Sequence, residues 1–378
     1  MPLQLLILLV LAVAAIIFSV LTAIAVVAMK TIDISRIRTR ERLYRIYSSK
    51  CSELLLGDLP PLAPGSKPSE AFALYESLIE PVKTSFATMS VTRRNAHRKA
   101  LRHVLVDFAQ DITGDSSDRL VYFFYSFGFV EEEIRLIRSR HWWVRAHAAR
   151  SMGLLGAKKA IAALTAALED SHRDVRTQAM HSLVKLVGPE ALKTILRLST
   201  KLSRWDEIEL SVIIAGYKND AVPHLVEALR HSDQSVVLFA TEMLGDIGFV
   251  DAVDPLMKLA HTTKDMNVRA AALHALGRLG DERAGGLVAE FLKSKIPSVR
   301  LSALEALGRI AGKASTDLLK PFMLGPVRDE KLAAARALAI VGKKGISLLQ
   351  KEAGSRDALT SAIAAQVLEE HGLTSIEA

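Results

Sequence analysis

Histidine and acidic side chains are the first place to look for chemistry in this 378-residue chain, because they supply most metal ligands and general acids and bases. The eleven histidines are scattered, with no HExxH motif and no two histidines at i and i+4. His224 stands three residues before Glu227, a spacing that can hold two ligands on one helix face, but no third ligand accompanies them. The pattern predicts surface histidines and no metal site.

Nucleophile and phosphate-binding motifs are also missing from the sequence. No GxSxG motif occurs, and glycine pairs such as Gly277 and Gly280 come at the ends of predicted helices and not between a strand and a helix. The single cysteine, Cys51, excludes an internal disulfide bond and a cysteine-cluster metal site. We expect it to be a free thiol near the surface, with acylation as the alternative. We therefore expect no catalytic residues, no cofactor and no enzymatic activity.

Residues 3–29 form an apolar run without a charged side chain. A helix of this length spans about 40 Å, more than the ~30 Å hydrocarbon core of a bilayer. A cleavable signal peptide would carry its basic residues before a shorter apolar core, so an uncleaved transmembrane helix is favoured. Because basic flanks stay in the cytoplasm, the N-terminus is expected outside and the rest of the chain inside, at the inner membrane of a bacterium.

The net charge of +8 is concentrated directly after the apolar run. Residues 30–58 are predicted to form a basic juxtamembrane helix at the anionic membrane surface. The alternative is a helix that continues from the membrane and docks on a partner membrane protein. The rest of the chain carries too little positive charge for a groove that follows nucleic acid, so no nucleic-acid partner is expected. The candidate membrane-surface residues are Arg36, Arg38, Arg40, Arg42 and Arg45.

A linker and a helical cap are expected next. Residues 59–69 contain four prolines and cannot continue a helix, whereas residues 70–141 are predicted to be helical. A basic helix face there, which includes Arg98 and Arg102, is expected in solvent, with phospholipid contact as the alternative. The aromatic run Tyr122–Phe129 is expected to cover the apolar end of the first repeat, although a binding patch would have the same composition.

One pattern recurs about every 32 residues from residue 142 to 372. An amphipathic helix that often opens with Val-Arg ends at a glycine, and a second apolar helix follows. Helices this short cannot hold a core alone, so about seven pairs must stack into an α-solenoid. The recurring arginines are expected to form a ladder of hydrogen bonds and ion pairs between repeats. The recurring glycines are Gly156, Gly188, Gly216, Gly248, Gly280, Gly312 and Gly342.

This pattern resembles the HEAT-repeat family, and within it the short repeats named after phycobilisome lyases. The resemblance implies an α-solenoid of about seven HEAT-like helix pairs. Together with the segments before it, the expected fold class is all-α: an N-terminal transmembrane helix, a helical cap and then the solenoid. The resemblance also implies a protein-binding surface on the concave face, which the second helices would line. Some relatives attach or detach bilins, so a bilin lyase-like or other HEAT-fold enzyme is the alternative function.

We therefore expect a membrane-tethered cytoplasmic scaffold that binds a partner protein. The layout is similar to that of bacterial membrane HEAT proteins associated with polysaccharide-making glycosyltransferases, which implies an integral membrane enzyme or a transport complex as the partner. The third repeat departs from the pattern and adds a tryptophan, so a distinctive patch is expected there. Candidate partner contacts are the polar residues of the second helices and three tryptophans, namely Lys193, Arg197, His224, Glu227, Arg230, Lys258, Glu290, Trp142, Trp143 and Trp205.

Overall fold

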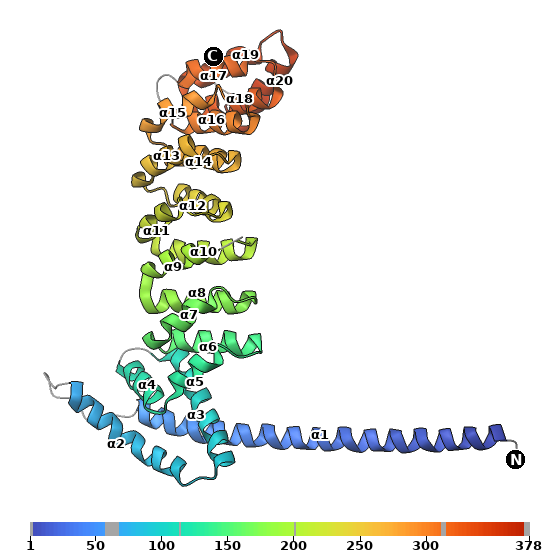
Figure 1. Cartoon of the computed structure of the whole chain (residues 1–378). Helices are drawn as coiled ribbons and strands as arrows, with labels where there is room; N and C mark the ends of the chain where they lie inside the picture. The colour runs from blue at the N-terminus through green and yellow to red at the C-terminus, as the bar shows by residue number, and fades with distance from the viewer. Residues whose placement is uncertain (1–2, 57–67, 113–114, 200–201, 311–314, 374–378) are drawn as a thin grey trace. The chain divides into compact units, whose positions relative to one another are not determined.

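The computed structural model describes residues 3–56, 68–112, 115–199, 202–310 and 315–373, and these residues form helices and connecting turns without a β-strand (Figure 1). The chain divides into two compact units, residues 1–160 and 161–378. The predicted all-α fold class is confirmed for the described residues.

Among its described residues, the first unit contains six helices and a short 3-10 turn at Lys158–Ala160. Its helices are α1 (Leu3–Leu56), α2 (Pro68–Ala87), α3 (Val91–Asp111), α4 (Asp115–Ser126), α5 (Phe129–Leu136) and α6 (Trp142–Leu154). The predicted apolar and basic helices are one continuous helix, α1. Its apolar side chains from Ile16 to Met29 are exposed, and the helix is long and apolar enough to cross a membrane. Most of the predicted linker falls on residues 57–67, outside the described residues, and its last two residues already belong to α2.

The second half of α1 belongs to the core of the first unit. Leu43, Tyr47, Cys51 and Leu55 are each buried, and their four-residue spacing places them on one face of the helix. This face contacts α3 and α4. The sequence predicted that this basic segment lies at the membrane surface or docks on a partner membrane protein, and neither interpretation included packing within the chain. The segment does continue from the apolar run as one helix, as the alternative held. It docks, however, on helices of its own chain. Cys51 is free but buried, so its expected place near the surface is wrong.

The aromatic run packs inside the first unit. Phe123, Phe124, Phe127 and Phe129 are all buried, and the rings of Phe127 and Phe129 stack at 5.6 Å. Helix α5, which follows the run, contacts α6. The packing interpretation is therefore confirmed for these four side chains. Because α6 packs on α3 and α5, the helix that was predicted to open the repeats at residue 142 belongs to the first compact unit.

The second unit alternates first and second helices, which Figure 1 shows as two parallel columns. Short 3-10 turns at Gly188–Glu190, Lys218–Ala221, Val250–Ala252 and Glu282–Ala284 precede four of the second helices. The seven second helices are as many as predicted, and a further helix, α20 (Ala358–Glu370), follows them. The first helices are α8 (Arg173–Val187), α10 (Arg204–Tyr217), α12 (Gln234–Ile247), α14 (Met266–Leu279), α16 (Pro297–Ile310) and α18 (Arg328–Val341). The second helices are α7 (Ile161–Ala167), α9 (Ala191–Leu198), α11 (Val222–Ala228), α13 (Val253–Thr262), α15 (Gly285–Phe291), α17 (Ser315–Met323) and α19 (Lys343–Ala353).

Consecutive first helices approach closely where a helix carries glycine. A Cβ atom added at Gly277 would lie 2.7 Å from the Cα of Ala306, and one added at Gly308 would lie 2.6 Å from the Cα of Ala337. These distances are too short for any side chain, so glycine allows α14, α16 and α18 to stack with their backbones nearly touching. The core beneath them consists of small and branched residues that are almost fully buried, such as Val268 and Ala272.

The glycine that ends each first helix adopts the left-handed conformation in most repeats, including Gly248 (φ 75°) and Gly280 (φ 65°). The third repeat is the exception. Helix α10 continues through Gly216, and Lys218 takes the positive φ of 48° instead. The prediction that Gly216 ends its helix is therefore wrong, and Gly312 lies outside the described residues.

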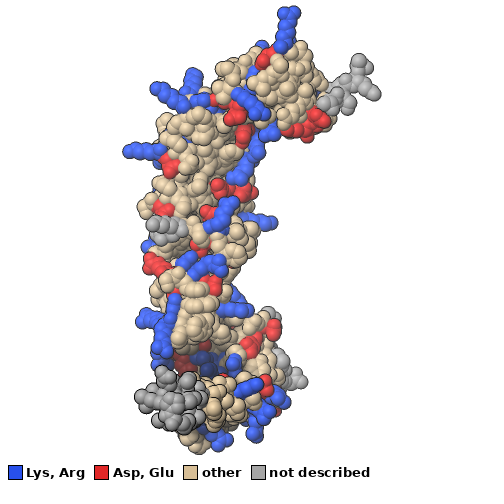
Figure 2. Space-filling model, turned by 90° about the vertical axis from the view of Figure 1, so that its right-hand side faces the viewer, with Lys and Arg blue, Asp and Glu red and all other residues tan. Residues whose placement is uncertain are grey.

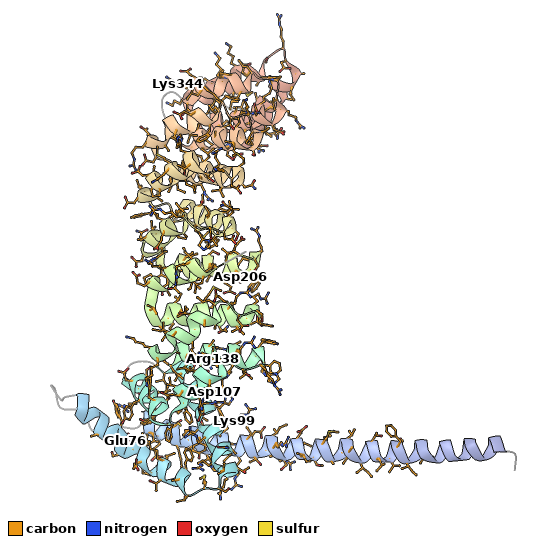
Figure 3. The ribbon with its side chains drawn as sticks, in the orientation of Figure 1. Glu76, Lys99, Asp107, Arg138, Asp206 and Lys344 are labelled. Carbon is orange, nitrogen blue, oxygen red and sulfur yellow. The ribbon has the colours of Figure 1, made fainter. Side chains whose placement is uncertain are left out.

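The recurring arginines have a structural role. Arg176 and Arg300 donate to the backbone carbonyls of Asp170 (3.1 Å) and Ser294 (2.7 Å), in each case six residues earlier. Each arginine also contacts an acid of the next repeat. Arg176 Nη2 lies 3.4 Å from Asp206, which Figure 3 labels on α10, and Arg300 Nη2 lies 2.5 Å from Glu330. The predicted ladder between repeats is confirmed at these two positions.

Candidate functional site

Five of the seven polar residues predicted on the second helices lie together. Lys193 and Arg197 on α9 and His224, Glu227 and Arg230 on or just after α11 line a hollow of about 310 Å³, which we call the second-helix hollow. Helices α9 and α11 contact each other, so the hollow belongs to two successive repeats of the second unit.

Ion pairs and a backbone contact connect the two sides of the second-helix hollow. Lys193 Nζ lies 3.3 Å from Glu227 Oε2, and His224 Nε2 lies 3.8 Å from Glu190 Oε1. His231 Nε2 lies 3.1 Å from the carbonyl oxygen of Arg197. His224 is buried, so the prediction that its side chain lies at the surface is wrong. The buried His224 side chain lines the hollow from α11.

The other predicted contacts lie elsewhere. Lys258 on α13 and Glu290 on α15 do not line the second-helix hollow. Trp205 is 45% exposed on α10, where the Arg173 guanidinium lies 4.9 Å from its ring centre. In the first unit, Trp142 and Trp143 are both exposed and meet edge to face at 6.0 Å. In the sequence, these two tryptophans were open to two interpretations, packing or a binding patch, and their exposure contradicts the packing that was favoured.

Helix α10 presents exposed apolar side chains beside Trp205. Ile208 and Val212 are 50% and 64% exposed, and the spacing of the three residues places them along one face of the helix. This agrees with the prediction of a distinctive patch in the third repeat. The signal in the sequence for this patch was the loss of the Val-Arg pair in the third repeat. Val212 could have been included in the predicted patch, because its spacing from Trp205 and Ile208 places it on the same helix face.

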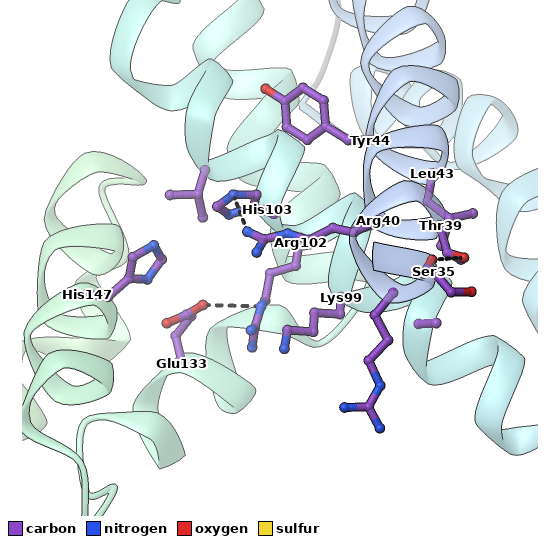
Figure 4. A pocket seen from close by; sticks show the side chains of 14 residues that line it. Ser35, Thr39, Arg40, Leu43, Tyr44, Lys99, Arg102, His103, Glu133 and His147 are labelled. Atoms are coloured by element: carbon purple, nitrogen blue, oxygen red, sulfur yellow. Dashed lines mark hydrogen bonds and ion pairs between the residues drawn. The ribbon is translucent and has the colours of Figure 1, made fainter. Parts of the chain in front are cut away.

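A basic cavity of about 370 Å³ lies in the first unit between α1, α3, α5 and α6, and we call it the juxtamembrane pocket (Figure 4). Two of the five predicted membrane-surface arginines, Arg36 and Arg40, line this pocket, whereas Arg38, Arg42 and Arg45 do not. The other polar side chains that line it are Ser35, Thr39, Tyr44, Lys99, Arg102, His103, Glu133 and His147.

The arginines of α3 were expected in solvent or at phospholipid, but two of them form ion pairs within the unit. Arg98 Nη2 lies 2.5 Å from Glu132 Oε1, and its guanidinium lies 4.9 Å from the centre of the Phe129 ring. Arg102 Nε lies 3.4 Å from Glu133 Oε1, the contact drawn as a dashed line in Figure 4. For Arg98 and Arg102, the solvated interpretation is therefore wrong.

Glu133 is the unusual member of the juxtamembrane pocket. Its side chain is 1% exposed, and neither carboxylate oxygen has a hydrogen-bond partner. Burial raises the pKa of Glu133, the Arg102 charge lowers it and Glu132 raises it further. Burial also lowers the pKa of His147, and the charges of His103 and Arg102 add to this effect. Sequence reasoning placed Glu133 at a helix start and missed its burial, because an acid in a charged run has no apolar periodicity.

No group of three histidine, cysteine, aspartate or glutamate side chains in the described part of the chain could hold a metal ion. On the face that Figure 2 shows, basic and acidic side chains are interspersed over the repeats. The two candidate sites differ in charge: the second-helix hollow has mixed charge, and the juxtamembrane pocket is mainly basic.

The comparisons with known proteins identify the repeats. The family described as HEAT repeats matches residues 133–209 and 222–294. The chain contains HEAT repeats. This confirms the resemblance that the sequence pattern indicated, and no curated protein matches the chain.

Several solved structures are similar to the chain at low sequence identity. An engineered protein matches with 21% identity over 88% of this chain and 99% of its own length, at a TM-score of 0.38. The CpcE and CpcF complex of phycocyanin lyase from Nostoc sp. PCC7120 matches with 22% identity over 66% and 90%, at 0.30. Human deoxyhypusine hydroxylase in complex with glycerol matches with 18% identity over 73% and 99%, at 0.29. At these identities and TM-scores, the similarities assign no activity to this HEAT-repeat chain.

Proposed function

We propose that this HEAT-repeat chain is a membrane-tethered scaffold, and not an enzyme, and that its second unit binds a partner protein. The observation that carries the proposal is the second-helix hollow, where four charged side chains and two histidines from two repeats line one surface. Surfaces built from successive repeats are the usual binding sites of solenoid proteins. Mixed charge favours a partner protein with complementary charges over a nucleic acid.

The apolar part of α1 supports the membrane tether. It is long enough to span a bilayer, and its side chains from Ile16 to Met29 are exposed in the part of the chain that the structure describes. The basic residues that follow favour a cytoplasmic position for both units, at the inner membrane of a bacterium. A tether restricts the scaffold to a surface, so an integral membrane enzyme, such as a polysaccharide-making glycosyltransferase, or a transporter is the class of partner that we propose.

Charge reversal in the second-helix hollow tests the proposal. The variant Arg197→Glu, Arg230→Glu changes two exposed side chains that line the hollow. We expect it to lose one integral membrane protein that the wild-type chain retains after crosslinking in intact cells, detergent extraction and purification through the C-terminus. The measurement is quantitative mass spectrometry of the purified complexes.

Lys258→Glu provides the matched control, because Lys258 is also an exposed cation on a second helix but does not line the hollow. This variant should retain the partner, and both variants should unfold at the temperature of the wild type. If the double variant retains the same partner as the control, the second-helix hollow is not the binding surface.

A further inference from the structure

The opening of the juxtamembrane pocket lies at the outer edge of the lipid headgroup layer, if α1 spans the membrane as proposed above. Its first lining residue, Ser35, comes six residues after Met29, the last residue of the apolar run. At 1.5 Å per residue, this is about 9 Å along the helix. The headgroup layer beyond each side of the hydrocarbon core is roughly 5–8 Å thick. A lipid headgroup beside α1 can therefore reach the opening of the pocket without leaving the bilayer.

The charges of the juxtamembrane pocket suit a phosphate group. Arg36, Arg40, Lys99 and Arg102 line it, against a single carboxylate, Glu133. The first three are exposed, whereas the Arg102 side chain is only 20% exposed, so the cations extend from the opening to the interior. Their partners leave capacity for a ligand, because Arg36 lies 3.9 Å from exposed Asp33 and Arg40 lies 3.2 Å from a His103 ring nitrogen. Arginine and lysine are the usual phosphate-binding side chains.

The interior of the pocket requires a hydrogen-bond donor as well. Both oxygens of Glu133 are buried without a hydrogen-bond partner, and Figure 4 shows the side chain pointing into the cavity toward Arg102. An unsatisfied buried carboxylate is costly, and buried polar groups normally have a partner. An ammonium or hydroxyl group on the ligand would supply that partner. Apolar side chains that include Leu43 and Val106 also line the cavity, which suits the glycerol and upper acyl carbons of a lipid.

We propose that the juxtamembrane pocket binds one phospholipid headgroup, with its phosphate at Arg36, Arg40 and Lys99 and an N–H or O–H donor of the same headgroup at Glu133. Phosphatidylethanolamine and phosphatidylglycerol have such donors. Phosphatidylcholine does not, because its nitrogen carries three methyl groups. The inference therefore goes beyond a basic segment at an anionic surface, since it predicts selection among lipids that have the same net charge.

Native mass spectrometry of the full chain in a neutral detergent tests the proposal. The chain is mixed with phosphatidylethanolamine or phosphatidylcholine of identical acyl chains, and the retained lipid is counted at increasing lipid concentration. We expect one phosphatidylethanolamine to be retained at a concentration about tenfold lower, because only its ammonium group can donate a hydrogen bond to the buried Glu133 carboxylate. Equal retention of the two lipids would overturn the assignment of the donor group to Glu133.

Two variants locate the site. Arg40→Gln, Lys99→Gln should lower the retention of both lipids about tenfold, whereas Arg38→Gln, Arg93→Gln removes the same charge from the same two helices outside the pocket and should retain them. Glu133→Gln should remove the preference for phosphatidylethanolamine while the protein still retains lipid. If both double variants lose lipid equally, the attraction is a general surface effect and the pocket is not the site.

A last comparison separates lipid from soluble phosphate. Millimolar inorganic phosphate or free phosphoethanolamine should not displace the bound lipid, because neither has acyl chains; displacement would make the pocket a site for a soluble phosphate compound and overturn the proposal. Extraction of membranes with alkaline carbonate gives an independent readout of the tether. A chain that stays in the membrane but shows no lipid selection contradicts only the pocket, whereas a chain released by carbonate contradicts the tether.

Discussion

Glu133 combines burial with a raised pKa, and this has a consequence for the stability of the first unit. Because its pKa is raised in the folded state, the folded chain holds the proton more tightly than the unfolded chain does. The contribution of Glu133 is therefore favourable below the usual glutamate pKa and is lost as the pH rises through the raised value. Arg102 from α3 lowers the pKa of Glu133 and Glu132 from α5 raises it, and these are the charged neighbours that modify this effect.

Replacement of Glu133 by glutamine removes this titration and keeps the shape of the side chain. We expect the difference in unfolding temperature, variant minus wild type, to become more positive as the pH is raised from 4 to 8 in lipid-free detergent. Thermal unfolding followed by circular dichroism measures it. A variant that loses stability with rising pH relative to the wild type would show that the ion pair with Arg102 outweighs burial.

Cys51 is the second residue whose environment predicts its chemistry. Burial raises the pKa of its thiol from 9.0 to about 12. At pH 8 this lowers the thiolate fraction about 1,000-fold, and the thiolate is the reactive form. Alkylation by iodoacetamide should therefore be slow in the folded protein and fast in denaturant, as measured by the mass of the intact chain. Fast modification of folded protein would contradict the packing of α1 on α3 and α4.

At the level of helices, the close stacking of α14, α16 and α18 depends on two glycines. Gly277→Ala or Gly308→Ala would place a Cβ within 2.7 Å of the neighbouring helix. The overpacking should cost about 1–3 kcal/mol, against a gain in helix propensity of roughly 1 kcal/mol. Each variant should therefore unfold a few degrees below the wild type in calorimetry, at about 2–4 °C per kcal/mol.

Gly286→Ala is the matched control, because Gly286 also lies in a helix but a Cβ added there meets nothing within 4 Å. This variant should be as stable as the wild type or slightly more stable. Equal destabilisation by all three substitutions would mean that the loss does not come from contact between neighbouring first helices.

The repeats could be predicted from the sequence because each repeat has the same physical requirements. Val268 and Ala272 fill the core and Gly277 allows close approach, and the same spacing recurs along the chain. The sequence could not predict that α10 continues through Gly216 and that Lys218 takes the positive φ instead. Which of these two residues ends the helix depends on the turn that follows. The sequence also did not predict that the second half of α1 packs in the core. Its buried residues alternate with arginines, and the residues that they contact lie about 50 positions away along the chain.

Only part of the juxtamembrane pocket could be predicted from the sequence. Arg36 and Arg40 were predicted at the membrane surface from their position after the apolar run, and both line the pocket. Glu133 and His147 come from helices roughly 100 residues later, and nothing in their local sequence distinguishes them from solvated residues. Only the packing of four helices places these side chains around one cavity, so the sequence could indicate the basic half of the site but not the acid.

For the whole molecule, deletion of the apolar run and deletion of all of α1 should have different effects on folding. Deletion of residues 3–29 removes apolar side chains that are exposed between Ile16 and Met29. Deletion of residues 3–56 also removes Leu43, Tyr47, Cys51 and Leu55 from the core. At about 1.5–3 kcal/mol for each buried side chain, the second deletion costs roughly 6–12 kcal/mol, which is comparable to the entire stability of a domain.

The shorter deletion should therefore give a soluble chain whose first unit stays folded, whereas the longer deletion should unfold the first unit. Limited proteolysis measures the difference, because it should cut within residues 68–137 only in the longer deletion. The second unit has its own core and should resist protease in both proteins, since its buried residues come from its own repeats. If the longer deletion also resists cleavage, then α1 contributes only a tether, and a pocket formed by α1 with α3, α5 and α6 could not be a stable part of the molecule.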